Sequence, residues 1–277
     1  MSAVGRRRTL PGFGLTMGLT LTWLSIIVLI PLAGLVLKTF ELSFDQFWGI
    51  ITSRRTLNAL KTSFGLAFLA AIVNLIAGMV IVWALTRYRF PGRRIFDAIV
   101  DIPFALPTAV AGVALTSLFA QKGWLGAPLA ELGIKVAFTP IGIFVAMVFI
   151  GIPFVVRTVQ PVLQDIDKEI EEVAACLGAS RWQTVWRVIL PSLLPAMLTG
   201  FALAFARAVG EYGSVIFIAG NLPNISEIAP LLIVIRLSEF RYADATAIAV
   251  VMLLASFIVI FAINRIQRWS QSRVVQS

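Results

Sequence analysis

The sequence predicts an all-α membrane protein that crosses the bilayer six times. Hydrophobic residues make up 59% of its 277 residues and charged residues only 13%, whereas a soluble domain is about half apolar and a quarter charged. Apolar runs also recur at about 20 residues, the length that a helix needs to cross a hydrocarbon core of about 30 Å. A soluble helical protein with an unusually apolar core is therefore disfavoured.

The predicted spanning helices follow the apolar runs in chain order. They are Leu15–Leu37, Thr62–Leu85, Phe96–Ala120, Pro140–Val156, Pro191–Ala219 and Ala245–Asn264. The first run follows three arginines, as in a signal peptide, but it exceeds the length of a signal peptide's apolar core and lacks a convincing cleavage site. We therefore expect an uncleaved anchor.

One apolar run, 215–235, contains residues that would break an ordinary span. These residues are Asn221, Pro223, Asn224, Glu227 and Pro230. We expect the run to hold the end of the fifth helix and then a re-entrant or surface segment. A seventh spanning helix is the alternative.

The basic residues indicate that both termini are cytoplasmic. With that orientation, 14 of the 23 Lys and Arg residues lie on the cytoplasmic side and eight on the other, with Arg207 inside a span. Positive charge accumulates on the cytoplasmic side of membrane proteins. Topology thus explains the net charge of +9, and no nucleic-acid partner is expected.

The composition also restricts the chemistry of the chain. There is no histidine and one cysteine, Cys176, so a Cys/His metal site and an intrachain disulfide are excluded. We expect Cys176 to be a small packed residue. No catalytic constellation falls in mid-span, and no P-loop motif is present. We therefore predict no catalytic residue, metal or cofactor in this chain, and any ATP and Mg²⁺ must bind to a partner.

The loop after the fourth span concentrates negative charge. Five of the 14 acidic residues fall within eight positions, namely Asp165, Asp167, Glu169, Glu171 and Glu172. Apolar residues between them recur at helical spacing, at Ile166, Ile170, Val173, Ala174 and Leu177. This pattern predicts an amphipathic helix with an acidic outer face.

A second short helix is predicted directly after the first. Gly178 can adopt the left-handed conformation that ends a helix, and Ser180 can cap the next one. A helical hairpin on the bilayer surface is one interpretation of the loop. Interfacial helices favour Lys and Arg, however, so an acidic amphipathic helix fits a groove on a protein better.

The loop resembles the EAA loop of binding-protein-dependent ABC permeases of the type I fold. The family pattern is matched by Glu172, Ala174, Gly178, Leu190 and Pro191. Val173 and Val188 replace the usual Ala and Ile, and both changes are mild. In that family the loop forms a coupling helix that inserts into a groove on the ATPase subunit. The resemblance therefore implies a type I ABC importer transmembrane domain.

Nearly the whole chain resembles the T-type permease subunit of sulfate/thiosulfate ABC importers. The resemblance is carried by residues 7–13, 86–93, 101–112, 153–161 and 207–213. The stretches 101–112 and 207–213 also resemble molybdate/tungstate permeases, which leaves another oxyanion as the alternative substrate. An ion-coupled secondary transporter is less favoured, because the chain shows no pair of matching halves.

The resemblance implies a bacterial inner-membrane complex. Its other members would be a W-type permease, two ATP-binding subunits and a periplasmic sulfate/thiosulfate-binding protein. The predicted organisation is a tail, first helix and first periplasmic loop in 1–60, a transmembrane core in 61–265 with the coupling loop at 157–190, and a cytoplasmic tail in 266–277.

Charged and proline residues inside the spans are candidates for the translocation path. Arg207 and Glu211 lie at i and i+4, within reach of each other, and Arg207 lies about 24 Å along the helix from Pro191. The pair is either a gate, with Arg207 supplying positive potential to a dianion, or a neutralised pair that fixes helix packing. Pro103 and Pro107 are expected to kink the third helix. The unwound backbone there either lines the path or only sets packing geometry.

Two further carboxylates are interpreted as structural. Asp97 and Asp101 fall at the predicted cytoplasmic start of the third helix, where the helix dipole favours anions. A path for sulfate gains nothing from two carboxylates.

Overall fold

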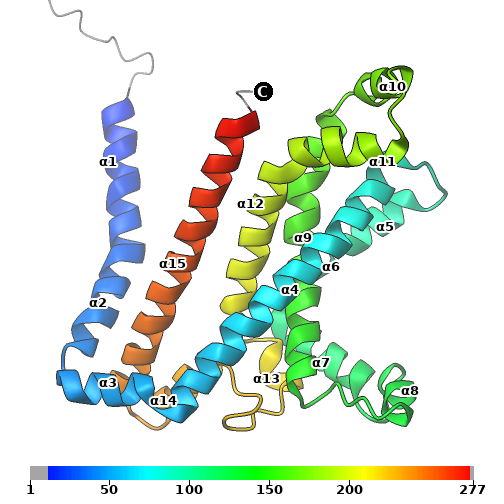
Figure 1. The fold of residues 1–277 in the computed structure, drawn as a ribbon. Coiled ribbons are helices and arrows are strands. Elements are labelled where there is room, and N and C mark those ends of the chain that lie inside the picture. The colour runs from blue at the N-terminus through cyan, green and yellow to red at the C-terminus, as the bar shows by residue number, and fades with distance from the viewer. Residues whose placement is uncertain (1–11, 275–277) are drawn as a thin grey trace, which may run out of the picture.

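The computed structural model describes residues 12–274, and in these residues it contains helices and no strand (Figure 1). In chain order the elements are α1 (Phe13–Leu24), the π-helical turn η1 (Ser25–Leu29), α2 (Ile30–Thr39), α3 (Phe44–Thr52), α4 (Arg54–Arg87), α5 (Arg93–Val100), α6 (Ile102–Ala105), α7 (Thr108–Phe119), α8 (Gly126–Glu131), α9 (Pro140–Asp165), α10 (Lys168–Cys176), α11 (Arg181–Thr184), the π-helical turn η2 (Val185–Ile189), α12 (Leu190–Val209), α13 (Val215–Ile218), α14 (Ala229–Ser238) and α15 (Tyr242–Val274).

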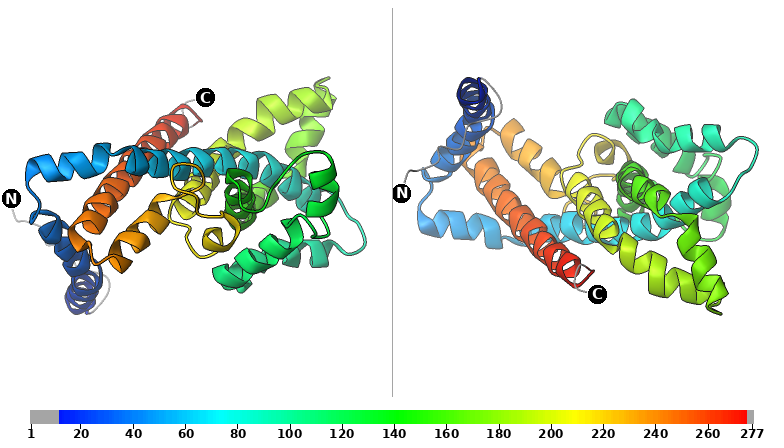
Figure 2. Two further views of the ribbon diagram at one scale, coloured as in Figure 1. Left: turned by 90° about the horizontal axis from the view of Figure 1, so that it is seen from below. Right: turned by 90° about the horizontal axis from the view of Figure 1, so that it is seen from above.

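The helices run between two sides of the molecule. One side carries α10 together with the start of α1 and the end of α15, and we call it the α10 side (Figure 1). The opposite side carries α3, α8 and α14, and we call it the α14 side. Seen along the bundle, α1 lies at one end of the molecule and α8 at the other, with α4 extending between them (Figure 2).

Five helical segments are long and apolar enough to cross a membrane. They are Phe13–Thr39, Arg54–Arg87, Pro140–Asp165, Arg181–Val209 and Tyr242–Ile266. Each contains or overlaps a predicted span, so the all-α membrane fold is confirmed. The fourth predicted span continues nine residues past Val156 in α9, and the sixth continues past Asn264 in α15.

The third predicted span is not one helix. It is divided into α5, α6 and α7, which together pass from the α10 side towards the α14 side (Figure 1). Leu106 and Pro107 have extended backbones, with ψ of 133° and 134°. Proline disfavours the helical conformation of the residue before it, so α6 ends at Ala105. The predicted distortion at Pro107 is confirmed as a complete break.

The fifth span begins and ends earlier in the chain than predicted. Its helical segment starts at Arg181, because α11 and η2 lead into α12 without interruption, and it ends at Val209 rather than Ala219. The segment passes Pro191 through η2, where the Leu190 N–H donates to the Val185 carbonyl. The wider turn accommodates the proline ring and its missing donor.

The run 215–235 contains only the short helices α13 and α14 within its apolar parts. Helix α14 has ten residues, which correspond to about 15 Å and are too few to cross a bilayer. It packs against α15 and α4 on the α14 side. This arrangement favours a re-entrant or surface segment over a seventh spanning helix.

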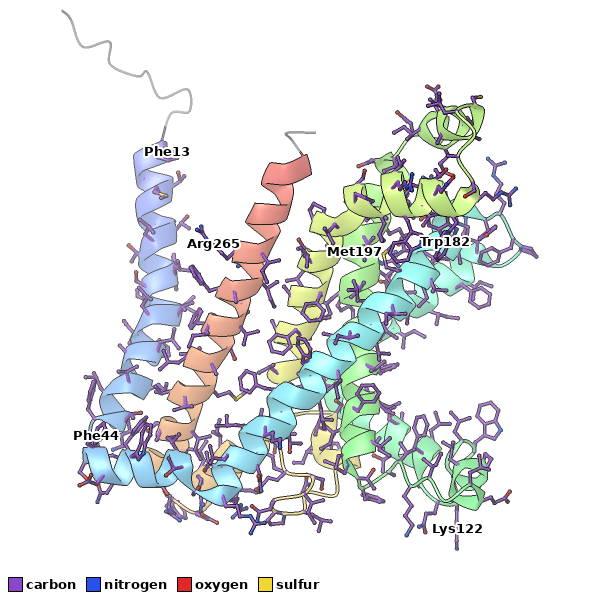
Figure 3. The ribbon with its side chains drawn as sticks, viewed as in Figure 1. Phe13, Phe44, Lys122, Trp182, Met197 and Arg265 are labelled. Atoms are coloured by element: carbon purple, nitrogen blue, oxygen red, sulfur yellow. The ribbon has the colours of Figure 1, made fainter. Side chains whose placement is uncertain are left out.

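The core forms where α4, α9 and α12 pack together. The buried face of α4 consists mainly of small residues at helical spacing, including Ala59, Ser63, Ala67, Ala71 and Gly78. Small residues let helix backbones approach closely in a membrane, where packing rather than the hydrophobic effect drives association. Helix α1 lies outside this core, since none of its residues is buried in the described chain (Figure 3).

Gly112 provides a test of close packing between α7 and the segment before α13. A Cβ on Gly112 would lie 2.5 Å from the Ser214 carbonyl oxygen and 2.7 Å from the Ser214 Cα. Because both neighbours are backbone atoms, Gly112→Ala should separate the two segments and cost about 1–3 kcal/mol, as overpacking does elsewhere. The change would appear as a lower melting temperature of the detergent-purified complex.

The matched control for Gly112→Ala is the same substitution at Gly65 of α4. Gly65 is exposed and a Cβ there would meet nothing within 4 Å. Alanine is favoured over glycine in a helix by about 1 kcal/mol. Gly65→Ala should therefore leave the melting temperature unchanged or raise it, and equal losses from both variants would contradict the packing argument.

Candidate functional site

The helix that carries the predicted coupling motif forms and ends as the sequence indicates. Helix α10 stops before Gly178, whose φ is 83°, and the Ala179 N–H donates to the Ala174 carbonyl at 3.0 Å. Ser180 then begins α11 with a capping box. Its hydroxyl oxygen accepts from the Gln183 N–H at 3.3 Å, and the Gln183 side-chain oxygen accepts from the Ser180 N–H at 2.8 Å.

The apolar side chains of this region are left uncovered by the described chain. On α10, Ile170 and Val173 are 44% and 58% exposed, and Leu177, directly after α10, is 83% exposed. On α11 and η2, Trp182 and Trp186 are also exposed and stack edge to face at 5.3 Å. We call these five residues the apolar stripe. Figure 3 shows Trp182 on the α10 side of the molecule.

The predicted coupling residues divide into two groups. Glu172, Ala174 and Gly178 lie together on or directly after α10, whereas Leu190 and Pro191 lie at the start of α12. Glu172 is exposed. Cys176 is exposed as well, so the expectation that it is packed is wrong. The sequence around Cys176 does not indicate how little of the surface of α10 the rest of the chain covers.

Helix α10 is joined to the membrane bundle by a buried arginine for which the sequence predicted no such role. The Nη2 atom of Arg87, the last residue of α4, lies 2.8 Å from a carboxylate oxygen of Glu171. The same nitrogen donates to the Ile166 carbonyl at 3.4 Å. The Arg87 side chain is only 9% exposed. A hollow of about 410 Å³ lies between the end of α4, α10 and α11.

Arg207 and Glu211 form the predicted pair, with 2.6 Å between Nη1 and the carboxylate. The Glu211 side chain is 1% exposed and that of Arg207 is 33% exposed. Because α12 ends at Val209, Glu211 lies in the connection to α13. There it also accepts from the Ser214 N–H at 2.9 Å and the Ser214 hydroxyl at 3.0 Å. These bonds support the packing interpretation and leave the gate as a prediction.

Of the predicted path prolines, Pro103 lies before the break in the third crossing and Pro107 lies in it. Pro103 is in the first turn of α6, and Pro107 immediately precedes α7. Phe104 packs edge to face on Phe154 of α9 at 5.1 Å. Whether the extended backbone at Leu106 and Pro107 lines a path stays a prediction.

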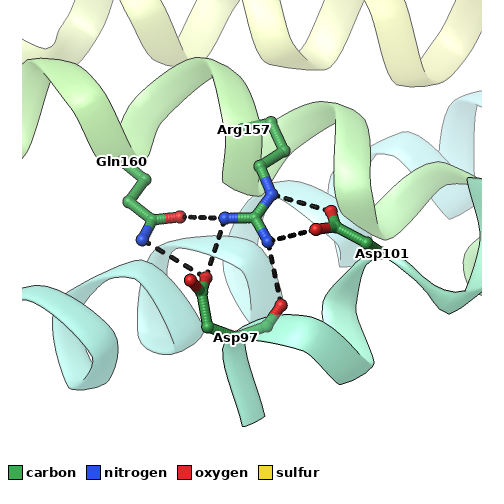
Figure 4. A network of polar contacts seen from close by, with 4 residues as sticks. All are labelled: Asp97, Asp101, Arg157 and Gln160. Atoms are coloured by element: carbon green, nitrogen blue, oxygen red, sulfur yellow. Dashed lines mark hydrogen bonds and ion pairs between the residues drawn. The ribbon is translucent and has the colours of Figure 1, made fainter. Parts of the chain in front are cut away.

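Asp97 and Asp101 bind Arg157 in the half of α9 that lies towards the α10 side (Figure 4). Arg157 Nε and Nη2 donate to the two carboxylate oxygens of Asp101, both at 2.7 Å. Its Nη1 donates to the Asp97 carboxylate at 2.7 Å and to Gln160 at 2.8 Å. The predicted role of the helix dipole is not supported. Asp97 lies in the middle of α5, and Asp101, between α5 and α6, makes no side-chain capping bond and accepts from Arg157 instead. The binding of both carboxylates by Arg157 was not predicted. The spacing of Asp97 and Asp101, four residues apart on one helix face, was the signal that they share a cationic partner.

A second missed pair lies on the α14 side. Arg55, in the first turn of α4, donates to both carboxylate oxygens of Glu227 at 2.8 and 2.7 Å. The Glu227 side chain is 1% exposed. An acid in an apolar run needs a cation partner when it is buried, which was the signal available in the sequence. Nearby, Arg236 donates to Glu239 at 2.7 Å and lowers the pKa of Glu239.

No group of three or more His, Cys, Asp or Glu side chains in residues 12–274 is arranged to hold a metal ion. The functional features of the described residues are an exposed amphipathic helix, α10, outside the membrane bundle, and ion pairs that join the helices to one another. Such an arrangement can transmit motion through the bundle from a partner that covers α10.

Solved structures that share this fold include chains of two ABC transporters. A bacterial alginate ABC transporter, in complex with an alginate-bound periplasmic protein, aligns with a TM-score of 0.76 over 92% of this chain and 93% of its own, at 18% identity. An inward-facing MetNI methionine ABC transporter aligns with a TM-score of 0.60 over 83% and 99%, also at 18% identity. At this level of identity the likeness concerns the fold alone.

The bundle, with α10 outside it, defines the class as a membrane subunit of an ABC transporter. Residues 75–276 match the model of the binding-protein-dependent transport system inner membrane component family, and the chain belongs to that family. Its curated relatives include the sulfate transport system permease protein CysT of Escherichia coli (strain K12), which is 50% identical over 99% of both chains. CysT of Synechococcus elongatus is 47% identical over 91% of this chain and 90% of its own.

Proposed function

We propose that this chain is the permease subunit of an ATP-driven importer that moves sulfate and thiosulfate across the bacterial inner membrane. The observation that carries the proposal is the 50% identity to a sulfate permease over 275 residues, which leaves no large part of the chain unmatched. The chain provides the membrane path and no nucleotide site. ATP and Mg²⁺ are used by the partner ATPases.

The proposed orientation places the α10 side in the cytoplasm. Both described ends of the chain lie on that side, which agrees with the excess of basic residues assigned to it. The apolar stripe is then available to an ATPase in the cytoplasm, and the α14 side faces a periplasmic sulfate- or thiosulfate-binding protein. Helix α10 is acidic, so it suits a protein groove better than an anionic lipid surface.

The proposed complex contains a second, W-type permease subunit, two ATPases and the binding protein. Helix α1 has no buried residue in this chain, and the exposed apolar surface of the spanning helices leaves area for lipid and for another permease. In the proposed cycle, closure of the ATPases moves α10 and tilts the bundle. The path then opens outward to receive the anion by alternating access.

Uptake of labelled sulfate into proteoliposomes tests this function. The purified complex should accumulate sulfate only with binding protein and internal ATP, and unlabelled thiosulfate should compete more strongly than molybdate. Stronger competition by molybdate or tungstate would assign the chain to another oxyanion.

The matched control is a complex whose ATPase cannot hydrolyse ATP. Uptake should then fall to the level of empty vesicles. Uptake that survives, driven by a proton or sodium gradient, would contradict the ATP-driven importer.

A further inference from the structure

We propose that α4 is a lever that carries motion from α10 to the loop 219–228 on the α14 side. It would be positioned by two ion pairs, Arg87–Glu171 at one end and Arg55–Glu227 at the other. The proposal rests on the proposed function, in which an ATPase moves α10. It assigns positioning roles to four residues that lie outside the family's coupling motif.

The first step is the attachment of α10 to α4. Within the described chain α10 packs against α11, and the hollow of about 410 Å³ lies between α10 and the end of α4. The Arg87–Glu171 contact of 2.8 Å spans this region. Since Arg87 is 9% exposed and also donates to the Ile166 carbonyl, it is held in place at the base of α10. A pair with so little solvent around one partner is costly to break.

The second step is the stiffness of α4. It is continuous over 34 residues, a length of about 51 Å at 1.5 Å per residue. Two other helices connect to the α10 region, but α9 contains Pro153 and Pro161 and α12 contains Pro195 after the turn η2. Prolines and π turns are the places where helices bend. Helix α4 has neither, so it transmits displacement with the least bending.

The third step is the attachment of α4 to the loop 219–228. Arg55 holds Glu227 by two hydrogen bonds of 2.8 and 2.7 Å. One turn further along, the Asn58 amide donates to Asn224 at 3.3 Å. Just after the loop, the Ala229 N–H donates to the buried Ser63 hydroxyl at 2.8 Å. Contacts along three turns of α4 thus make the loop move with the helix.

Labelling of a cysteine in the loop measures the motion directly. Leu222 is half exposed in the loop, so Leu222→Cys is made in a Cys176→Ser background, which removes the natural cysteine. The full complex is assembled in proteoliposomes with a hydrolysis-deficient ATPase. The rate of modification by a membrane-impermeant maleimide is then compared with and without ATP.

The reference complex should show a nucleotide-dependent labelling rate, and Arg87→Gln should abolish that dependence. In the hydrolysis-competent complex, Arg87→Gln should lower sulfate uptake per ATP hydrolysed by about fivefold or more, within the usual range of coupling between distant sites. The charge swap Arg87→Glu with Glu171→Arg should restore both quantities. Replacing Arg55 and Glu227 together with glutamine leaves no buried charge, and it should also abolish the response of Leu222→Cys.

Arg89→Gln is the matched control, because Arg89 lies two residues after Arg87, is exposed and has no ion pair among the described residues. It should label and transport like the reference. If Arg87→Gln fails to assemble, replacing Arg87 and Glu171 together with glutamine provides the same test. Labelling that stays nucleotide-dependent in the Arg87 variants would overturn the lever. Failure of the reference complex to take up sulfate would instead overturn the proposed substrate, since the labelling assay needs none.

Discussion

Val173→Asp or Leu177→Asp should release the ATPase from the complex. Both side chains belong to the apolar stripe and are more than half exposed in this chain, so they become buried only if a partner covers them. Burial of one such side chain contributes about 1.5–3 kcal/mol, and a carboxylate in its place must also be desolvated. We expect the affinity for the ATPase to fall by about 10- to 100-fold or more.

Binding of the purified ATPase to the permease in detergent measures this effect directly. Val173→Ile and Leu177→Met keep the side chains apolar and are the matched controls, with affinities expected near that of the natural chain. The isolated permease should remain folded in every variant, because the exposed positions contribute little to its own core. An unchanged affinity in Val173→Asp and Leu177→Asp would show that the apolar stripe faces something other than the ATPase.

Arg207→Ala should abolish sulfate uptake while the complex still assembles. Glu211 is 1% exposed and Arg207 is its cationic partner at 2.6 Å. Removing one member of such a buried pair costs about 3–5 kcal/mol, because the other charge is left uncompensated. The two bonds from Ser214 remain and limit the damage to the connection between α12 and α13. The melting temperature should therefore fall together with uptake.

A second variant separates packing from transport. Arg207→Met combined with Glu211→Gln removes both charges and keeps side chains of similar length, so the melting temperature should recover most of its loss. If Arg207 attracts the dianion in the path, uptake stays absent in this stable variant. Recovery of uptake together with stability would contradict that role and leave the pair as a packing element.

The locally encoded parts of the coupling region were predictable. Helix α10 ends before Gly178 because glycine adopts the positive φ that ends the helix without steric cost. Ser180 then caps α11 through Gln183, three residues further along. These features depend on neighbours in the chain. The exposed state of Cys176, in contrast, depends on how far α10 extends from the bundle, which hydropathy does not report.

The charged pairs show why the rest was not predictable. Arg55 and Glu227 are separated by 172 positions, and Arg157 and Asp97 by 60. Each charged residue can be identified in the sequence, but its ion-pair partner cannot, because the partner depends on how one helix packs against another. The misplaced end of the fifth helix has a different origin. Gly210 follows Val209 directly and Gly213 lies three residues further on. Glycine disfavours a helix interior, so a local signal for the end of the helix was present and was outweighed by the apolar residues beyond it.

The membrane class, the approximate spans, the coupling motif and the family could all be predicted from the sequence, because hydropathy, capping and motif spacing are local properties. The tertiary structure, in contrast, was needed to find that α4 is held by ion pairs at both ends. It also decided that α10 is bound to the bundle through Arg87. Both features require residues far apart in the chain to come into contact. The contacts that stabilise them form only when the protein folds.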